Sequence, residues 1–200
     1  VRSLTGRIVF VPEYRNPEAL RGIDGFSHLW LLFDFSLAHR EGWSPTVRPP
    51  RLGGNTRVGV FASRSPFRPN NIGLSCVRFE RIEKTPDEGD ALIVSGVDLL
   101  DMTPIYDIKP YIPYADCHED AVGGYADRES GHRLDVVFPD EMLELIPDEK
   151  RQAASDCLAD DPRPAYQNDP ARIYSMAFAG FDIRFTIDGD VLRVTEVVRR

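Results

Sequence analysis

Apolar residues in the first two thirds of the chain fall in short runs separated by glycine, proline and asparagine. Short runs rich in β-branched and aromatic residues are typical of strands. Residues 16–22 form a different pattern and predict a short helical turn, because Asn16 can cap it, Pro17 can open it and Gly22 can end it. We expect strands at residues 6–11, 28–37, 57–64, 72–82, 91–100, 105–112 and 134–138.

The pattern changes after Pro139. Residues 140–146 and 149–159 have helical character, and two or three strands are expected within residues 172–198. Asp188-Gly189 stands between alternating apolar residues, which indicates a hairpin. Many short strands with few helices suggest a closed or sandwiched antiparallel sheet. We predict a mainly β domain over residues 1–137 and a small α+β domain over residues 138–200.

Composition sets limits on the class of protein. With 200 residues, 42% of them hydrophobic and 28% charged, the chain can bury a core without disulfides or a metal. No apolar run approaches the roughly 20 residues of a membrane span. Three cysteines without paired spacing favour a reducing compartment, so we expect a cytoplasmic protein. Because the chain begins with Val1, we expect its natural start to lie upstream.

The charge is unevenly distributed along the chain. The whole chain carries −8, yet residues 42–79 contain no acidic residue and carry +6, which leaves −14 for the remainder. With the prolines, glycines and asparagines of the same window, these charges indicate a shaped loop surface that receives an anion. The alternative is that each arginine pairs with an acidic residue from elsewhere in the chain. For any single arginine we favour this alternative, and for the group we favour the anion site. The arginines are Arg48, Arg51, Arg57, Arg64, Arg68 and Arg78.

Several common enzyme signatures are missing from the sequence. No G-x-G-x-x-G follows a strand, and neither a phosphate-binding G-x-x-x-x-G-K-[ST] nor a G-x-S-x-G motif occurs. The potential ligands at residues 117–120 (CHED) have no correctly spaced partner, so we expect no metal site. A Rossmann dinucleotide site and an α/β-hydrolase are therefore unsupported.

Five blocks of residues together carry a recognisable signature. They are GFSHLW at 25–30, GW with TVRPPRLGGN at 42–55, GVFASRSPFRPNNIGLS at 59–75, DLLDMTP with DIKPY at 98–111, and DPRPAY at 161–166. In this order and over nearly the whole chain, the set resembles the TsaA-like, or TrmO, family of tRNA N6-methyltransferases. The resemblance implies a single-sheet β-barrel methyltransferase of non-Rossmann type that uses S-adenosylmethionine and works as a homodimer. The implied reaction adds a methyl group to N6 of threonylcarbamoyladenosine at position 37 of threonine tRNA, in the anticodon loop.

The resemblance also implies where the cofactor binds, and it shows three departures. The family usually has a polar pair where Ser36 and Leu37 stand, and glycine where Met102 stands. Relatives carry a further strand and a Pro-Arg-Gln element before the point where this chain begins, which we expect to lie upstream. Asp98 and Asp101 suit ribose hydroxyls or the sulfonium, or else a turn before Pro104. The cofactor candidates are Ser36, Leu37, Arg64, Leu74, Asp98, Leu99, Leu100, Asp101 and Met102.

Methyl transfer from a sulfonium needs close positioning more than acid–base machinery. A hydrogen-bond acceptor near the weakly nucleophilic nitrogen would help, and Asp161 and Tyr166 are the candidates. The alternative is that Asp161 caps a turn and Tyr166 packs. Arg163 suits the threonyl carboxylate of the modified base.

Recognition of a single-stranded loop should combine phosphate contacts with stacking. Trp43, Phe61 and Phe67 supply aromatic rings. The residues that we expect to contact RNA are Arg48, Arg51, Arg68, Asn70 and Arg163.

A rival hypothesis from another class is a non-catalytic RNA- or nucleotide-binding barrel that has lost its cofactor contacts. Ser36, Leu37, Met102 and the missing front element favour it, whereas the block at 64–75 and the intact DPRPAY favour the enzyme. Methylation of a different acceptor is a third option.

Overall fold

The fold is taken from a computed structural model, which describes residues 3–49, 56–128, 133–163 and 169–200. The chain divides into two compact units. One unit comprises residues 2–47 and 59–121, and the other comprises residues 48–58 and 122–200.

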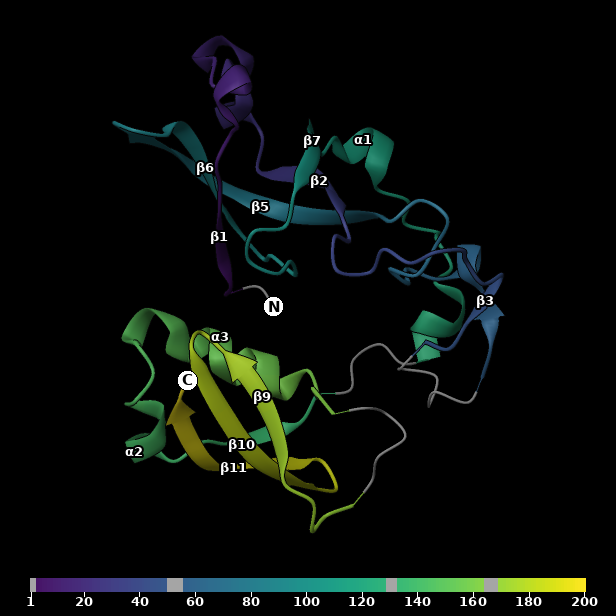
Figure 1. The fold of residues 1–200 in the computed structure, drawn as a ribbon, viewed down its shortest axis with the longest axis vertical. Helices are drawn as coiled ribbons and strands as arrows, with labels where there is room; N and C mark the ends of the chain where they lie inside the picture. The colour runs from purple at the N-terminus through teal and green to yellow at the C-terminus, as the bar shows by residue number, and fades with distance from the viewer. Residues whose placement is uncertain (1–2, 50–55, 129–132, 164–168) are drawn as a thin grey trace. The chain divides into compact units, whose positions relative to one another are not determined.

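A five-stranded antiparallel sheet forms the first unit (Figure 1). Its strands follow the order β1-β6-β5-β2-β7. The longest strand, β5, pairs with β2 along its first half and with β6 along its second half. The strands are β1 (Thr5–Ile8), β2 (His28–Asp34), β5 (Ile72–Thr85), β6 (Gly89–Ser95) and β7 (Ile105–Pro110).

Alternating burial along β5 gives the sheet a core face and an open face. Gly73, Ser75 and Val77 are buried, whereas Leu74 and Cys76 between them are exposed. Because successive strand residues point to opposite faces, the buried set lies on one side of the sheet. The core on that side contains Leu29, Leu31, Val77, Leu92 and Val94.

Short elements connect the strands. Asn16 caps the second 3₁₀ helix, since its side chain accepts a hydrogen bond from the Glu18 amide at 3.0 Å, as the sequence predicted. The strands β3 (Thr46–Val47) and β4 (Val58–Gly59) pair with each other. The remaining elements are η1 (Pro12–Tyr14), η2 (Pro17–Leu20), η3 (Ile23–Gly25), η5 (Val60–Ala62) and α1 (Pro113–Asp116).

The second unit contains a four-stranded sheet in the order β8-β11-β10-β9, in which β8 runs parallel to β11. The predicted hairpin is confirmed, because Asp188 pairs with Val191 and Gly189 takes the left-handed φ of 56° that a tight turn requires. Its buried core includes Ile146, Leu158, Ile183, Phe185 and Leu192. The elements are η6 (Gly124–Arg128), β8 (Asp135–Val137), α2 (Asp140–Leu143), α3 (Asp148–Ala159), β9 (Tyr174–Phe178), β10 (Phe181–Asp188) and β11 (Val191–Arg199).

The strand expected at 57–64 is wrong over most of its length. Only Val58–Gly59 is a strand, and Val60–Ala62 forms the 3₁₀ helix η5. The Val60 amide donates to the Pro45 carbonyl at 3.0 Å, and the Ser63 hydroxyl donates to the Val60 carbonyl at 2.8 Å. These bonds bend a β-branched sequence out of the extended conformation.

Other strands also end earlier than the sequence predicted, among them β1, which stops at Ile8 rather than residue 11. β2 stops at Asp34 rather than residue 37, because Ala38 donates to the Phe35 carbonyl at 2.8 Å and turns the chain. β6 stops at Ser95 rather than residue 100, since Gly96 adopts a left-handed φ of 78°.

The mainly β fold with a few helices is confirmed. Closure of the first sheet into a barrel stays a prediction, because the described strands pair in a linear order that ends at β1 and β7. The domain division at residue 137 also stays a prediction. Among the described residues, no helix is both long and apolar enough to cross a membrane.

Gly73 is the position where the sheet tolerates no side chain. A Cβ atom there would overlap the ring carbons of Phe33, whose side chain is buried on the facing strand β2. We expect Gly73→Ala to lower the free energy of unfolding by about 1–3 kcal/mol through overpacking, measured by urea denaturation. Gly25→Ala is the matched control, because a Cβ at Gly25 meets nothing within 4 Å. Equal stability of the two variants would contradict this packing.

Candidate functional site

Three loops start from one end of the first sheet. Asp34 at the end of β2 pairs with Ile72 at the start of β5, and its amide donates to the Pro104 carbonyl, just before β7, at 2.9 Å. One residue on, the Phe35 amide donates to the Asn71 carbonyl at 2.8 Å. The candidate site is therefore defined here as residues 34–40, 63–75 and 98–106.

The side chain of Asn71 joins two of these loops. Its amide nitrogen donates to the Pro66 carbonyl at 2.7 Å and to the Ala38 carbonyl at 3.5 Å. Ala38 is itself buried. Asn71 thus holds the segment after β2 against the loop before β5.

The loop before β5 is also braced internally. Ser63 and Ser65 accept hydrogen bonds from the amides of Ser65 and Phe67 at 3.3 and 3.2 Å. The Arg68 guanidinium donates to the Ser63 carbonyl at 3.1 Å. The Arg40 guanidinium lies 3.6 Å from the centroid of the Phe67 ring, a cation–π contact that ties this loop to the first one.

Asp34 is the polar centre of this sheet end. Its carboxylate is mostly buried, at 13% exposed, and lies 2.7 Å from Nε2 of His39. Desolvation, together with the charge and hydrogen bond of Asp34, raises the pKa of the Tyr106 hydroxyl. Asp34 was not among the residues predicted for the site, although a carboxylate that ends an apolar run is a signal visible in the sequence.

The third loop is attached through Ser75. Its hydroxyl is buried within β5 and donates to the Asp98 carboxylate at 2.5 Å. The turn before Pro104 is closed by Thr103, whose amide and hydroxyl donate to the Leu100 carbonyl at 3.3 and 2.7 Å. Met102 adopts a left-handed φ of 60°, a conformation that suits glycine and costs other residues about 1–2 kcal/mol. This accounts for glycine being the residue expected at that position from the family resemblance.

All nine predicted cofactor-contacting residues belong to these loops or to β5 beside them. Four of the five apolar members are unusually open, with Leu37 85%, Leu74 47%, Leu100 67% and Met102 89% exposed, whereas Leu99 packs partly buried against the sheet core. The predicted RNA-contacting residues Arg68 and Asn70 lie in the loop that follows Arg64. Apolar, acidic and guanidinium groups therefore surround one sheet end.

Other predicted residues belong to the second unit or lie outside the residues that the structure describes. Asp161, at a left-handed φ of 52°, accepts from the Arg163 amide at 3.3 Å and pairs with its guanidinium at 3.0 Å. Both side chains are largely buried, and Asp161 does stabilise a turn here. Arg48 is exposed in the same unit. Tyr166 and Arg51 lie outside the described residues, and the catalytic assignments stay predictions.

The arginines of the acid-free window are only partly neutralised. Arg78 lies 3.5 Å from the Glu80 carboxylate on an exposed surface, where such a pair stabilises little. Within the described part of the chain, no carboxylate pairs with Arg48, Arg64 or Arg68. Three cations of the window thus remain available to an anion.

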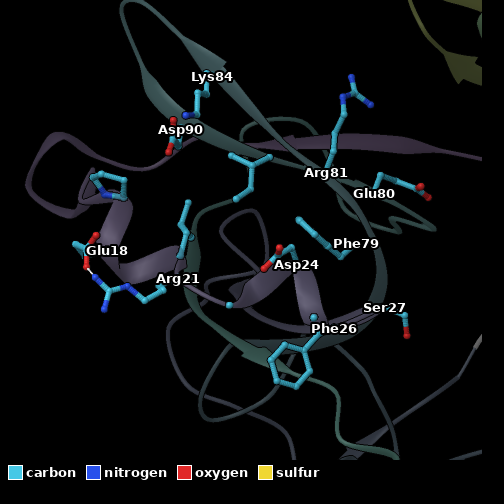
Figure 2. Close-up of a pocket in the computed structure, with 15 residues that line it drawn as sticks. Glu18, Arg21, Asp24, Phe26, Ser27, Phe79, Glu80, Arg81, Lys84 and Asp90 are labelled. Carbon is cyan, nitrogen blue, oxygen red and sulfur yellow. Dashed lines mark ion pairs between the residues drawn. The ribbon is translucent and has the colours of Figure 1, made fainter.

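A hollow lies elsewhere in the first unit. It has a volume of about 830 Å³ and is lined by the segment 17–27 and by strands β5 and β6 (Figure 2). Its charged lining is mixed, and Glu18 pairs there with Arg21. None of the predicted site residues lines it. The exposed side chains of Leu37, Leu100 and Met102 make the candidate site an open surface. In the described ranges, no three His, Cys, Asp or Glu side chains gather as metal ligands would.

The fold and the site define a two-part, mainly β protein whose loops converge at a sheet end instead of a Rossmann crevice. Residues 1–117 match the tRNA-methyltransferase O N-terminal domain, and residues 132–200 match the TrmO C-terminal domain. The chain therefore belongs to the TrmO family.

Individual relatives match over most of their length. A tRNA (adenine(37)-N6)-methyltransferase from Eikenella corrodens is 44% identical, over 86% of this chain and 97% of that protein. The protein of the same name from Escherichia coli K12 is 40% identical, over 94% of this chain and 83% of that protein. A crystal structure of TrmO from Pseudomonas aeruginosa superposes with a TM-score of 0.77 at 33% identity, covering 100% of this chain and 85% of that one.

Removing the Asn71 side chain should loosen the site without unfolding the sheet. Asn71→Ala deletes the donors to Pro66 and Ala38, and one such bond contributes about 1 kcal/mol. We expect amide hydrogen exchange to rise about fivefold in residues 35–40 and 63–70, measured by mass spectrometry. Asn70→Ala, which removes an exposed neighbouring amide, should leave exchange unchanged. The same exchange in both variants would show that Asn71 does not join the loops.

Proposed function

We propose that this protein is an S-adenosylmethionine-dependent tRNA methyltransferase that methylates N6 of the adenine at position 37. The observation that carries the proposal is the match to both TrmO domains, together with relatives of that name at 40–44% identity. We further propose threonylcarbamoyladenosine in the anticodon loop of threonine tRNA as the substrate. The protein would then work in the cytoplasm, alongside its tRNA.

The residues at the sheet end suit the chemical groups of S-adenosylmethionine. The exposed apolar side chains of Leu37, Leu74 and Met102 suit its adenine and methyl groups. The carboxylates of Asp98 and Asp101 suit its ribose hydroxyls, and the Arg64 guanidinium suits its carboxylate. When bound, the cofactor supplies a methyl group on a positively charged sulfur. The loops of the chain would orient the acceptor and exclude water from it.

We propose that the DPRPAY segment acts on the acceptor base. Asp161 would accept a hydrogen bond from the acceptor nitrogen, and Tyr166 would assist it. The Asp161–Arg163 pair supports this assignment, because it holds the carboxylate in a fixed position. Arg163 would also attract the threonyl carboxylate of the modified base.

A homodimer would cover the open face of the first sheet. Ile72, Leu74 and Cys76 are exposed along β5, and Leu74 and Cys76 pair with Leu32 and Trp30 on β2. A patch of this kind is typical of protein–protein contacts. Light scattering on the protein as it elutes from a size-exclusion column would measure its molar mass in solution. A monomer at assay concentration would contradict the dimer.

A barrel closed by a further strand beside β1 or β7 is also part of the proposal.

The non-catalytic alternative has less support. It depended on Ser36, Leu37 and Met102, which depart from the family pattern. A Pyrococcus abyssi relative, 36% identical over 70% of this chain and 69% of that protein, is a probable S-adenosyl-L-methionine-binding protein by name, so cofactor binding itself is expected in this family.

The proposal predicts a specific product. Threonine tRNA carrying threonylcarbamoyladenosine, incubated with the protein and S-adenosylmethionine, should gain one methyl group on N6 of base 37, detected by nucleoside mass spectrometry. Asp161→Asn should lower kcat about 10²-fold or more if it acts on the acceptor nitrogen. Arg163→Ala should lower kcat/KM on the modified tRNA. Arg133→Ala, an exposed arginine already paired with Asp156 at 3.5 Å, is the control. The absence of any methylated nucleoside would reject the proposal.

The arginine window predicts a particular salt dependence. Each arginine that contacts a phosphate of single-stranded RNA adds about 0.7 to the slope of log affinity against log salt. Arg48→Ala and Arg51→Ala should each flatten that slope by about 0.7, measured by fluorescence anisotropy with an anticodon stem-loop. Arg133→Ala should not change it, since that arginine is engaged by carboxylates. Unaltered slopes in the window variants would exclude those two arginines from the RNA contact.

A further inference from the structure

Two large aromatic side chains lie together on the surface of the first unit. Trp43 is 55% exposed and Phe61 is 74% exposed. Their ring centroids are 6.2 Å apart and their planes are inclined by 34°. Single exposed aromatic residues are ordinary, but two rings this close form an open apolar surface that a flat ligand can cover.

Buried neighbours hold this pair in position. Val60, which precedes Phe61, is only 1% exposed, and its amide donates to the Pro45 carbonyl at 3.0 Å. The Ser63 hydroxyl closes the same 3₁₀ turn by donating to the Val60 carbonyl at 2.8 Å. The bond from Val60 to Pro45 fixes the loop that carries Trp43 beside η5. The rings are therefore anchored by the backbone beneath them while their own faces stay open.

The surroundings favour an anionic, flat ligand. No acidic residue occurs between Gly42 and Phe79, and the guanidinium of Arg68, a predicted RNA-contacting residue, donates to the carbonyl of Ser63 just after η5 at 3.1 Å. The third aromatic ring of this region, Phe67, is already covered by the Arg40 guanidinium. Trp43 and Phe61 are thus the rings of this group that remain free to stack.

We propose that Trp43 and Phe61 form a stacking platform for an unpaired nucleobase of the RNA substrate. The proposal rests on the proposed function, which supplies a single-stranded RNA loop as the ligand. A π-face is common to all bases, so such a platform binds bases with little regard to sequence. We assign the RNA rather than the adenine of the cofactor, because neither Trp43 nor Phe61 belongs to the predicted cofactor set, whose members lie in the segments 34–40, 63–75 and 98–106. The platform would hold a base next to the target in a splayed-out loop.

The test uses the fluorescence of Trp43. The chain has two tryptophans, so the Trp43 component is the difference between the unaltered protein and Trp43→Phe. Titration with an anticodon stem-loop should quench the unaltered protein, and the quenching should disappear in Trp43→Phe while most affinity remains. Equal quenching in both proteins would overturn the proposal, and this readout needs only a conservative variant that keeps an aromatic ring.

Alanine variants separate stacking from other roles. Trp43→Ala and Phe61→Ala should each weaken stem-loop binding by about 5- to 150-fold. Binding of S-adenosylhomocysteine should stay unchanged, and Tyr114→Ala, which removes a tyrosine that is 91% exposed on α1, should have no effect. Three outcomes would each overturn the proposal. They are an unchanged stem-loop affinity, an equal loss of affinity for a blunt RNA duplex, and a matching loss of S-adenosylhomocysteine affinity. Absence of methyl transfer with the stacking signal intact would count against the proposed function alone.

Discussion

The register of β2 against β5 is the constraint on which the candidate site depends. Phe33 is buried over Gly73, and no other residue type fits beneath its ring without overlap. A slip of one residue would place Ile72 or Leu74 there and turn the core face of β5 outward. Because the register is fixed, Asp34 meets Ile72, and the backbone bond from Phe35 to Asn71 follows directly. The loops that carry the site are then attached at defined positions.

This arrangement matches what methyl transfer from a sulfonium requires. An in-line displacement gains most from holding donor and acceptor in the correct geometry. The loops meet that need through hydrogen bonds to backbone carbonyls and to a buried serine, as Asn71 and Ser75 illustrate. A sheet that supplies rigid anchor points allows such loops to vary in sequence, which is why departures such as Met102 can be accommodated.

Local patterns were sufficient to predict the elements whose causes are local. The apolar runs of β2 and β5 and the glycine of the Asp188-Gly189 turn indicated these elements, although β2 ends three residues earlier than predicted. Residues 57–64 were misassigned because the bond between Val60 and Pro45 joins positions that no local pattern connects. For the site, the predicted cofactor residues came from a family resemblance, whereas the roles of Asp34 and Asn71 depend on contacts that appear only in three dimensions.

An open site is consistent with a macromolecular substrate. The hollow of about 830 Å³ in the first unit is lined by mixed charges, and the predicted site residues are not part of its lining. Leu37 and Met102 are instead almost fully exposed, an arrangement that stabilises nothing in the isolated chain. The bases and phosphates of a folded RNA loop can cover the other side of the site. The protein therefore needs to surround the reacting groups from one side only. Under that condition water is excluded only when the substrate is bound, which confines efficient methyl transfer to the complex with the correct RNA.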